Sequence, residues 1–274
     1  MKIFKNFAAQ WLCLGIALLQ LPAMGAGSPW QRVVMIGASA SAGFVLSEPF
    51  GGPNTTKCKL SYYVDAAIAA PHPPVQNLAT ALVFMNPGVL EPVQVANATN
   101  AHPTLVIAVD FMFWFCYGQA GSDAERAQRF ENGLKLLEQI HCPLVVGDVP
   151  DASSATNTGI IGAEQVPSEK ARQAANKRLR VWAAARPSVA VVPLSEFMHA
   201  AMANEAIKLR GESLPAGSTR VLVQDDQLHP TPRGAAVLAL AILDALTTKH
   251  PEIPVTDVNW NWQTVLQKGY QLAK

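Results

Sequence analysis

Short runs of apolar, largely β-branched residues recur along the chain and are separated by longer amphipathic stretches. The runs that predict buried strands are 32–36, 104–109, 143–146, 188–192 and 220–223. Unbroken apolar runs of this length are typical of parallel strands that are covered on both faces. The pattern therefore predicts a mostly parallel sheet.

The stretches between these runs carry helix-start signals. Ser122 and Glu125 have the spacing of a capping box and predict a helix to about residue 140, while Ser168 opens a second helix. Thr231 followed by Pro232 predicts a third helix, to about residue 247. Alternating strands and helices indicate the α/β class, as a three-layer α/β/α sandwich. A long polar loop is expected over 149–165.

The first 25 residues have the composition of an export signal. Lys2 and Lys5 precede an apolar stretch over 11–21, and small residues follow at 23–27. This order predicts a cleaved signal peptide over 1–25 and a single domain over 26–274, exported to the periplasm or the medium. An uncleaved anchor is the alternative, although the apolar stretch is short for a bilayer span. No stable membrane insertion is expected of the mature chain.

Composition narrows the classes of partner. Half of the 274 residues are hydrophobic, which suits one well-packed domain, and 21 Lys and Arg against 20 Asp and Glu give no reason to expect nucleic acid. The mature chain would keep Cys58, Cys116 and Cys142, whose spacing matches neither a metal site nor a disulfide framework, although one disulfide could form. We expect no metal and no cofactor. The oligomeric state is open.

A serine follows the first predicted strand directly. The strand at 32–36 runs into Gly37, Ala38 and Ser39, at the end of the sheet where α/β proteins place their ligand crevices. A serine in this position can present both its hydroxyl and its backbone N–H, which acyl-transfer chemistry requires. An ordinary turn is the alternative.

An acid and a histidine lie near the other end of the chain. Asp226 and His229 stand three residues apart, just before the proline-initiated helix. If this segment turns once, the carboxylate can orient the imidazole and leave its other nitrogen for a nucleophile. A surface aspartate and a helix-capping histidine are the alternative.

Together the two segments resemble the first and last blocks of the SGNH/GDSL family of serine hydrolases. The last block, Asp226-Gln-Leu-His229-Pro-Thr-Pro-Arg-Gly234, matches closely, and the block order spans nearly the whole mature chain. The resemblance implies a flavodoxin-like sandwich and a metal-independent esterase. Ser39 would attack the ester, His229 would act as base and then acid, and Asp226 would orient His229.

The chain departs from the family pattern at three positions. Ala38 stands where the first block usually has aspartate, and Ala81 and Asp110 are the candidates for the glycine and asparagine of the oxyanion hole. The N–H of Ala81 could still donate, as could that of Ser39. Asp110 would have to be protonated through burial, or would serve another purpose such as orienting a neighbour.

Several assignments remain open at this level. Ser41 is an alternative nucleophile and Asp225 an alternative acid. Phe111, Phe113 and Trp114 could form an apolar wall for an acyl group or a stacking surface for a sugar, or could belong to the core.

The substrate stays open as well. It could be a small-molecule, lipid or acylated-carbohydrate ester, with hydrolysis or acyl transfer as the reaction. The competing hypothesis is a catalytically decayed scaffold that binds a glycan or a lipid.

Overall fold

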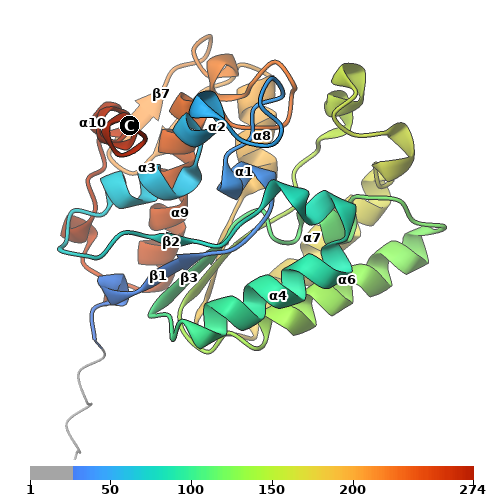
Figure 1. The fold of residues 1–274 in the computed structure, drawn as a ribbon, viewed down its shortest axis with the longest axis horizontal. Coiled ribbons are helices and arrows are strands. Elements are labelled where there is room, and N and C mark those ends of the chain that lie inside the picture. Colours follow the sequence, from blue (N-terminus) through green and yellow to red (C-terminus); the bar gives the residue numbers. More distant parts are fainter. Residues whose placement is uncertain (1–26) are drawn as a thin grey trace, which may run out of the picture.

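A five-stranded parallel sheet forms the centre of the molecule (Figure 1). The computed structural model describes residues 27–274, so the predicted export signal over 1–25 lies outside the described residues. The strand order is β2-β1-β3-β4-β5, which is the flavodoxin-like order. The strands are β1 (Val33–Met35), β2 (Gln76–Asn77), β3 (Leu105–Ala108), β4 (Leu144–Gly147) and β5 (Val189–Val192). The predicted three-layer α/β class is confirmed.

Helices cover both faces of this sheet. The α-helices are α1 (Ser39–Ala42), α2 (Pro53–Lys57), α3 (Leu60–Ala67), α4 (Pro87–Asn100), α5 (Phe113–Cys116), α6 (Asp123–Leu137), α7 (Glu169–Ala184), α8 (Leu194–Met202), α9 (Pro232–Lys249) and α10 (Trp262–Leu272). One core cluster joins α4, α6 and α7 to the face that carries Val34 and Val106. The other joins α3, α9 and α10 to the face that carries Met35 and Ile107. Successive side chains of one strand therefore pack into the two core clusters on opposite faces of the sheet.

The predicted helix starts are confirmed by their caps. The hydroxyl of Ser122 accepts a hydrogen bond from the Glu125 N–H at 3.2 Å, and that of Ser168 accepts from Ala171 at 3.1 Å. Thr231 caps α9 by accepting from the Gly234 N–H at 3.1 Å. Each hydroxyl satisfies a backbone donor that has no partner inside its helix.

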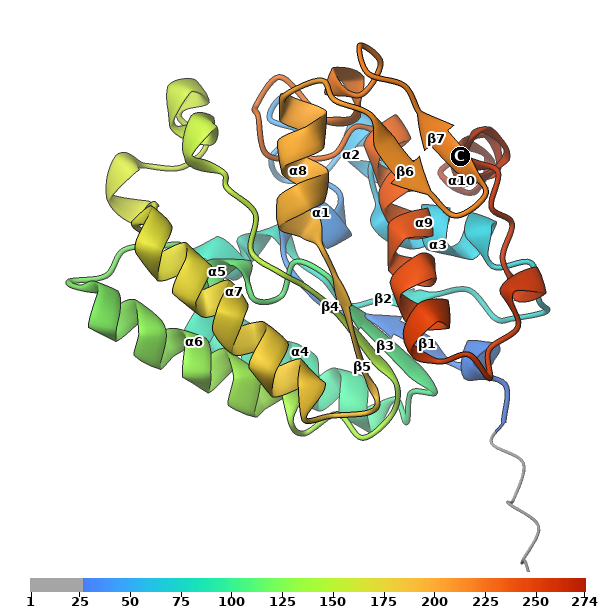
Figure 2. The same cartoon turned by 180° about the vertical axis from the view of Figure 1, so that it is seen from behind.

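The expected strand over 220–223 is wrong. Arg220–Leu222 forms the 3-10 helix η5, and Val223 makes only an isolated bridge to Pro230. The segment lies outside the five-stranded sheet and Val221 is 50% exposed, so the run is not covered on both faces. Among the strands, β2 was not predicted, nor was the hairpin of β6 (Ile207–Leu209) and β7 (Glu212–Leu214), which lies beside α8 and α9 (Figure 2). Of the helices, only α6, α7 and α9 were predicted.

The remaining segments are short turns of 3-10 helix. They are η1 (Pro29–Gln31), η2 (Ala81–Met85), η3 (Ser153–Thr158), η4 (Ala163–Gln165) and η6 (Val255–Asp257). The loop expected over 149–165 thus carries η3 and η4. Within residues 27–274, no helix has the length and apolarity needed to cross a bilayer. Cys58, Cys116 and Cys142 carry free thiols.

Candidate active site

Ser39 is the first residue of α1, just beyond the carboxyl end of β1 (Figure 1). The turn between strand and helix depends on Gly37, whose φ of 145° is rarely adopted by residues with a side chain. A Cβ at Gly37 would also lie 2.1 Å from a carboxylate oxygen of Asp110. The chain can therefore pass close to Asp110 and leave the Ser39 side chain partly exposed.

A second loop, between η5 and α9, brings the acid and the histidine to the same place. Its two ends are joined by the hydrogen bond from the Gln224 N–H to the His229 carbonyl, at 2.8 Å. Gln227 lies at its tip with φ of 62°, in the left-handed region. This sharp turn lets two residues three apart in sequence face each other.

Ser39, His229 and Asp226 form a continuous chain of hydrogen bonds. The Ser39 Oγ lies 2.8 Å from Nε2 of His229, and Nδ1 of the same ring lies 2.6 Å from Oδ2 of Asp226. His229 and Asp226 are both buried, and the Phe44 ring packs on the imidazole with centroids 4.4 Å apart. Distances and order are those of a nucleophile, a base and an orienting acid.

The Asp226 carboxylate has enough donors to remain ionised. Burial raises the pKa of Asp226. The hydrogen bond and charge interaction with the His229 ring, and hydrogen bonds from two backbone N–H groups, outweigh burial and hold that pKa below its ordinary value. Those backbone donors are Leu228 and His229, each 3.0 Å from Oδ1. A charged acceptor facing Nδ1 fixes the tautomer in which Nε2 can accept the serine proton.

Three side chains from distant elements hold the turn that carries Ser39. The Gln94 amide on α4 binds both the N–H and the carbonyl of Gly37, at 2.7 and 2.9 Å. Asp110, beyond β3, accepts hydrogen bonds from the N–H groups of Ala38 and Ser41, at 3.1 and 3.0 Å. The Asn77 amide on β2 donates to the Ser41 carbonyl at 3.0 Å. The position of Ser39 is thus fixed from three sides.

These contacts bear on the two interpretations of Asp110. Its Oδ1 also accepts from the Ser41 hydroxyl at 2.6 Å, so both carboxylate oxygens are engaged as acceptors. Asp110 therefore contacts the turn that carries Ser39, as the orienting interpretation expects. Ser41 is fully buried on Asp110, whereas Ser39 meets the imidazole. Asp225 is exposed and Asp226 is the residue that contacts His229.

Backbone donors near Ser39 are available for an oxyanion. In the described part of the chain, the N–H groups of Ser39 and Ala40 have no hydrogen-bond acceptor, as expected for the first turn of a helix. Ala81 begins η2, which contacts α1, and its N–H also lacks an acceptor among residues 27–274.

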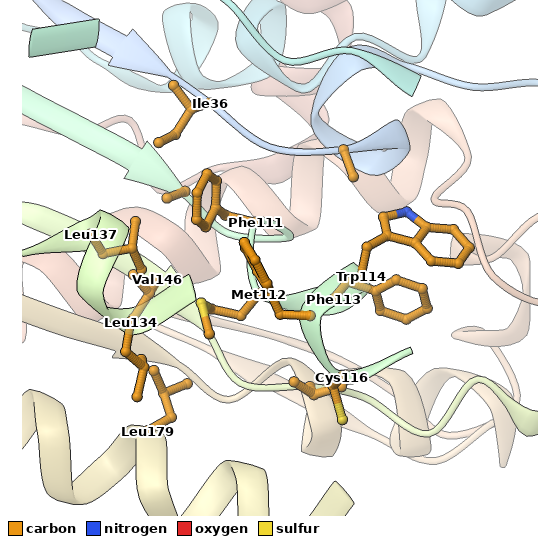
Figure 3. Close-up of a cluster of buried hydrophobic side chains, with 14 of the residues drawn as sticks. Ile36, Phe111, Met112, Phe113, Trp114, Cys116, Leu134, Leu137, Val146 and Leu179 are labelled. Carbon is orange, nitrogen blue, oxygen red and sulfur yellow. The ribbon is translucent and has the colours of Figure 1, made fainter. Parts of the chain in front are cut away.

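The aromatic residues 111–117 divide between the core and the site. Phe111 is fully buried beside Ile36 and Met112 (Figure 3), so the structure places it in the core and not in a substrate pocket. Trp114 is also buried and packs edge to face on Phe113, with centroids 5.2 Å apart. Phe113 reaches an apolar cavity that Ser39 and His229 also line.

Sequence reasoning missed the residues that support the site. Gln94 and Asn77 lie within segments that carry no motif, and their partners are 57 and 36 residues away. The hydroxyl of Thr158, in η3, donates to the Asp226 carbonyl at 3.0 Å and ties the long loop to the site. No local pattern signals any of these contacts. Among residues 27–274, no cluster of side chains suits a metal ion.

Comparison with known proteins supports the fold. No protein-family model matches this chain, and neither does any curated protein sequence. Among solved structures, the lipase/acylhydrolase from Enterococcus faecalis is similar, with a TM-score of 0.51 and 16% sequence identity. The similarity covers 84% of this chain and 98% of that one. At this identity, what the two proteins share is the α/β architecture.

Proposed function

We propose that the chain is a serine esterase that cleaves a carboxylic ester or an O-acyl group through an acyl-enzyme on Ser39. The observation that carries the proposal is the hydrogen-bond chain from Ser39 Oγ through His229 to Asp226. The similarity to a lipase/acylhydrolase is consistent with it.

The reaction would proceed in two steps. Ser39 Oγ attacks the acyl carbon while His229 Nε2 takes the hydroxyl proton, and the same nitrogen then gives that proton to the departing alcohol. Water next attacks the acyl-enzyme, gives its proton to His229, and releases the acid and the free serine. Asp226 stabilises the imidazolium in both steps. No metal or cofactor is needed for this route.

The oxyanion of each tetrahedral intermediate needs preorganised donors. The N–H of Ser39 is one candidate, and those of Ala40 and Ala81 are others, because all three lack acceptors within the described residues. Asp110 would act indirectly, by holding the turn that presents the Ser39 N–H. Backbone donors would also explain how the site tolerates alanine at position 81.

Labelling with a fluorophosphonate probe tests this assignment. The wild-type protein should react, Ser39→Ala should not, and Ser41→Ala should still react, because the Ser41 hydroxyl is buried on Asp110. Ser47→Ala, at an exposed serine, serves as the matched control. Undiminished labelling of Ser39→Ala would overturn the proposal, and so would labelling that only Ser41→Ala removes.

Turnover separates the esterase from a decayed scaffold that only binds its ligand. An esterase should release p-nitrophenol from p-nitrophenyl acetate with multiple turnovers, and Ser39→Ala should lower kcat by about 10³-fold or more. Binding without turnover on all ester substrates would favour the decayed scaffold. Export of the protein stays a prediction from residues 1–25.

A further inference from the structure

The cavity beside Ser39 is small and walled by hydrocarbon. Its volume is about 80 Å³, and Ser39 and His229 lie on its surface. Its other walls come mainly from apolar side chains of α5, α8, η5 and α9: Phe113, Leu194, Phe197, Met198, Leu222 and Leu238. Asp110 also lines the cavity, but both of its carboxylate oxygens already accept hydrogen bonds from Ala38 and Ser41. The walls are otherwise mostly apolar and favour an alkyl group.

The size of the cavity limits what it can hold. Cavities for drug-sized ligands measure about 300–1,000 Å³. The cavity beside Ser39, at about 80 Å³, lies well below that range. A space of this size favours a short alkyl group over a fatty acyl chain or a sugar ring.

The reaction favours the acyl group as the occupant over the alcohol. The acyl group stays bonded to Ser39 Oγ between the two steps, so an apolar cavity next to Oγ can hold it throughout. The alcohol must leave for solvent before water can enter.

A much larger groove shares one lining residue, Phe197, with this cavity. The groove has a volume of about 1220 Å³ and runs along β5, α8 and α9. Of the described residues, Phe197 alone lines both the groove and the cavity beside Ser39. Its side chain is only partly buried, so it can be truncated with less loss of core packing than its fully enclosed neighbours.

We propose that the cavity beside Ser39 holds the acyl group of the substrate, restricts it to about two to four carbons, and ends at Phe197. Phe197 is then the residue that determines acyl-chain length. This inference rests on the proposed esterase function and adds the substrate class: esters of short-chain carboxylic acids.

Two series of esters test the proposal. In the first, p-nitrophenyl esters carry acyl chains of two to twelve carbons. In the second, acetate esters carry alcohols of the same lengths. The wild-type kcat/KM should be highest for acyl chains of two to four carbons and should fall by about tenfold or more at eight. The alcohol series should show no such fall, because the leaving group lies outside the cavity.

The variant Phe197→Ala should join the cavity to the groove. It should shift the best acyl chain to six carbons or more while keeping measurable turnover of the acetate ester. Phe50→Ala is the matched control, because Phe50 is 93% exposed and lines neither space. It should give the wild-type profile. Phe197→Leu, a smaller change, serves if Phe197→Ala does not fold.

Two results would overturn the acyl assignment while leaving the esterase proposal intact. One is a wild-type optimum at eight carbons or more, and the other is a sharp cutoff in the alcohol series instead of the acyl series. An unchanged profile in both folded Phe197 variants would remove Phe197 as the determinant. Failure of the proposed function would look different, since no ester would turn over and Ser39 would not label.

Discussion

At the residue scale, the two carboxylate oxygens of Asp226 make different contacts. Oδ1 accepts two backbone N–H groups and so holds its own loop, while Oδ2 faces the His229 ring. Gln227 adopts a left-handed φ of 62° to allow this turn, which costs about 1 kcal/mol or more. The loop can sustain that strain because its ends are bonded to each other and to α9. The D-x-x-H spacing thus has a physical reason.

The substitution Asp226→Asn should separate these two kinds of contact. The asparagine oxygen can still accept the backbone N–H groups, so the fold should be kept. Its NH₂ group cannot accept from Nδ1–H, so it favours the tautomer in which Nε2 is protonated and cannot act as base. We expect kcat on p-nitrophenyl acetate to fall by about 10²- to 10⁴-fold with KM little changed. Asp225→Asn, at the exposed neighbour, should keep wild-type kinetics. A decrease of less than tenfold in Asp226→Asn would contradict the orienting role.

At the scale of elements, the last sequence block acts as a rigid connection between η5 and α9. Thr231 donates from its N–H to the Leu222 carbonyl at 2.8 Å and from its hydroxyl to the Val221 carbonyl at 2.7 Å. Gly234 completes the contact, because the first turn of α9 lies directly against the Leu222 carbonyl. Gly234 is therefore required by the close packing of the α9 backbone against Leu222, and not by a role in the reaction.

Gly234→Ala should consequently change the positions of Asp226 and His229, although Gly234 lies outside the hydrogen-bond chain that they form with Ser39. A Cβ there would lie 1.9 Å from the Leu222 carbonyl oxygen, so η5 and α9 would have to separate and the loop carrying Asp226 and His229 would shift. We expect a loss of unfolding free energy of about 1–3 kcal/mol in urea titrations, together with a lower kcat. Gly88→Ala, in α4, is the matched control, since its Cβ would meet only an Asn86 side-chain oxygen at 3.8 Å. Equal stability of both variants would contradict this account.

At the scale of the whole molecule, the sequence predicted the elements that have a clear local pattern, namely the buried apolar strands and the capped helices. Strands β1, β3, β4 and β5 were predicted because each is an apolar run buried on both faces. Strand β2 has two polar residues at an edge and gives no such signal. The short 220–223 run has the apolar composition of a strand, but it forms the 3-10 helix η5, which leads into the loop that carries Asp226 and His229.

The same division applies to the candidate site. Ser39, Asp226 and His229 could be chosen because the two segments that carry them occur together, in the order serine, aspartate, histidine. The roles of Gln94 and Asn77, and the walls of the cavity beside Ser39, depend on which elements pack together. That packing is a property of the tertiary structure, so no pattern within one segment could reveal it.

One buried acid affects the stability of the whole molecule. Glu91, in α4, is fully buried, and none of the described residues gives either carboxylate oxygen a hydrogen bond. Burial, and next the negative charge of Asp110, raise the pKa of Glu91 to about 10. The side chain is therefore protonated in the folded protein at neutral pH, whereas in the unfolded chain it is ionised.

This difference makes stability depend on pH with a definite sign. Between the ordinary Glu pKa of 4.5 and the folded value of about 10, the folded state binds one more proton than the unfolded state, so the free energy of unfolding falls as pH rises. Glu91→Gln removes the titrating group and keeps the size of the side chain. Its unfolding free energy relative to wild type should therefore increase steadily from pH 5 to pH 9, as measured by urea titration at each pH. The unfolding free energy of Glu196→Gln, a control at an exposed position of α8, should change with pH in parallel with that of the wild type. A Glu91→Gln curve parallel to wild type would mean that Glu91 is already ionised in the folded protein, and that Asp110 holds the Ser39 turn beside a second negative charge.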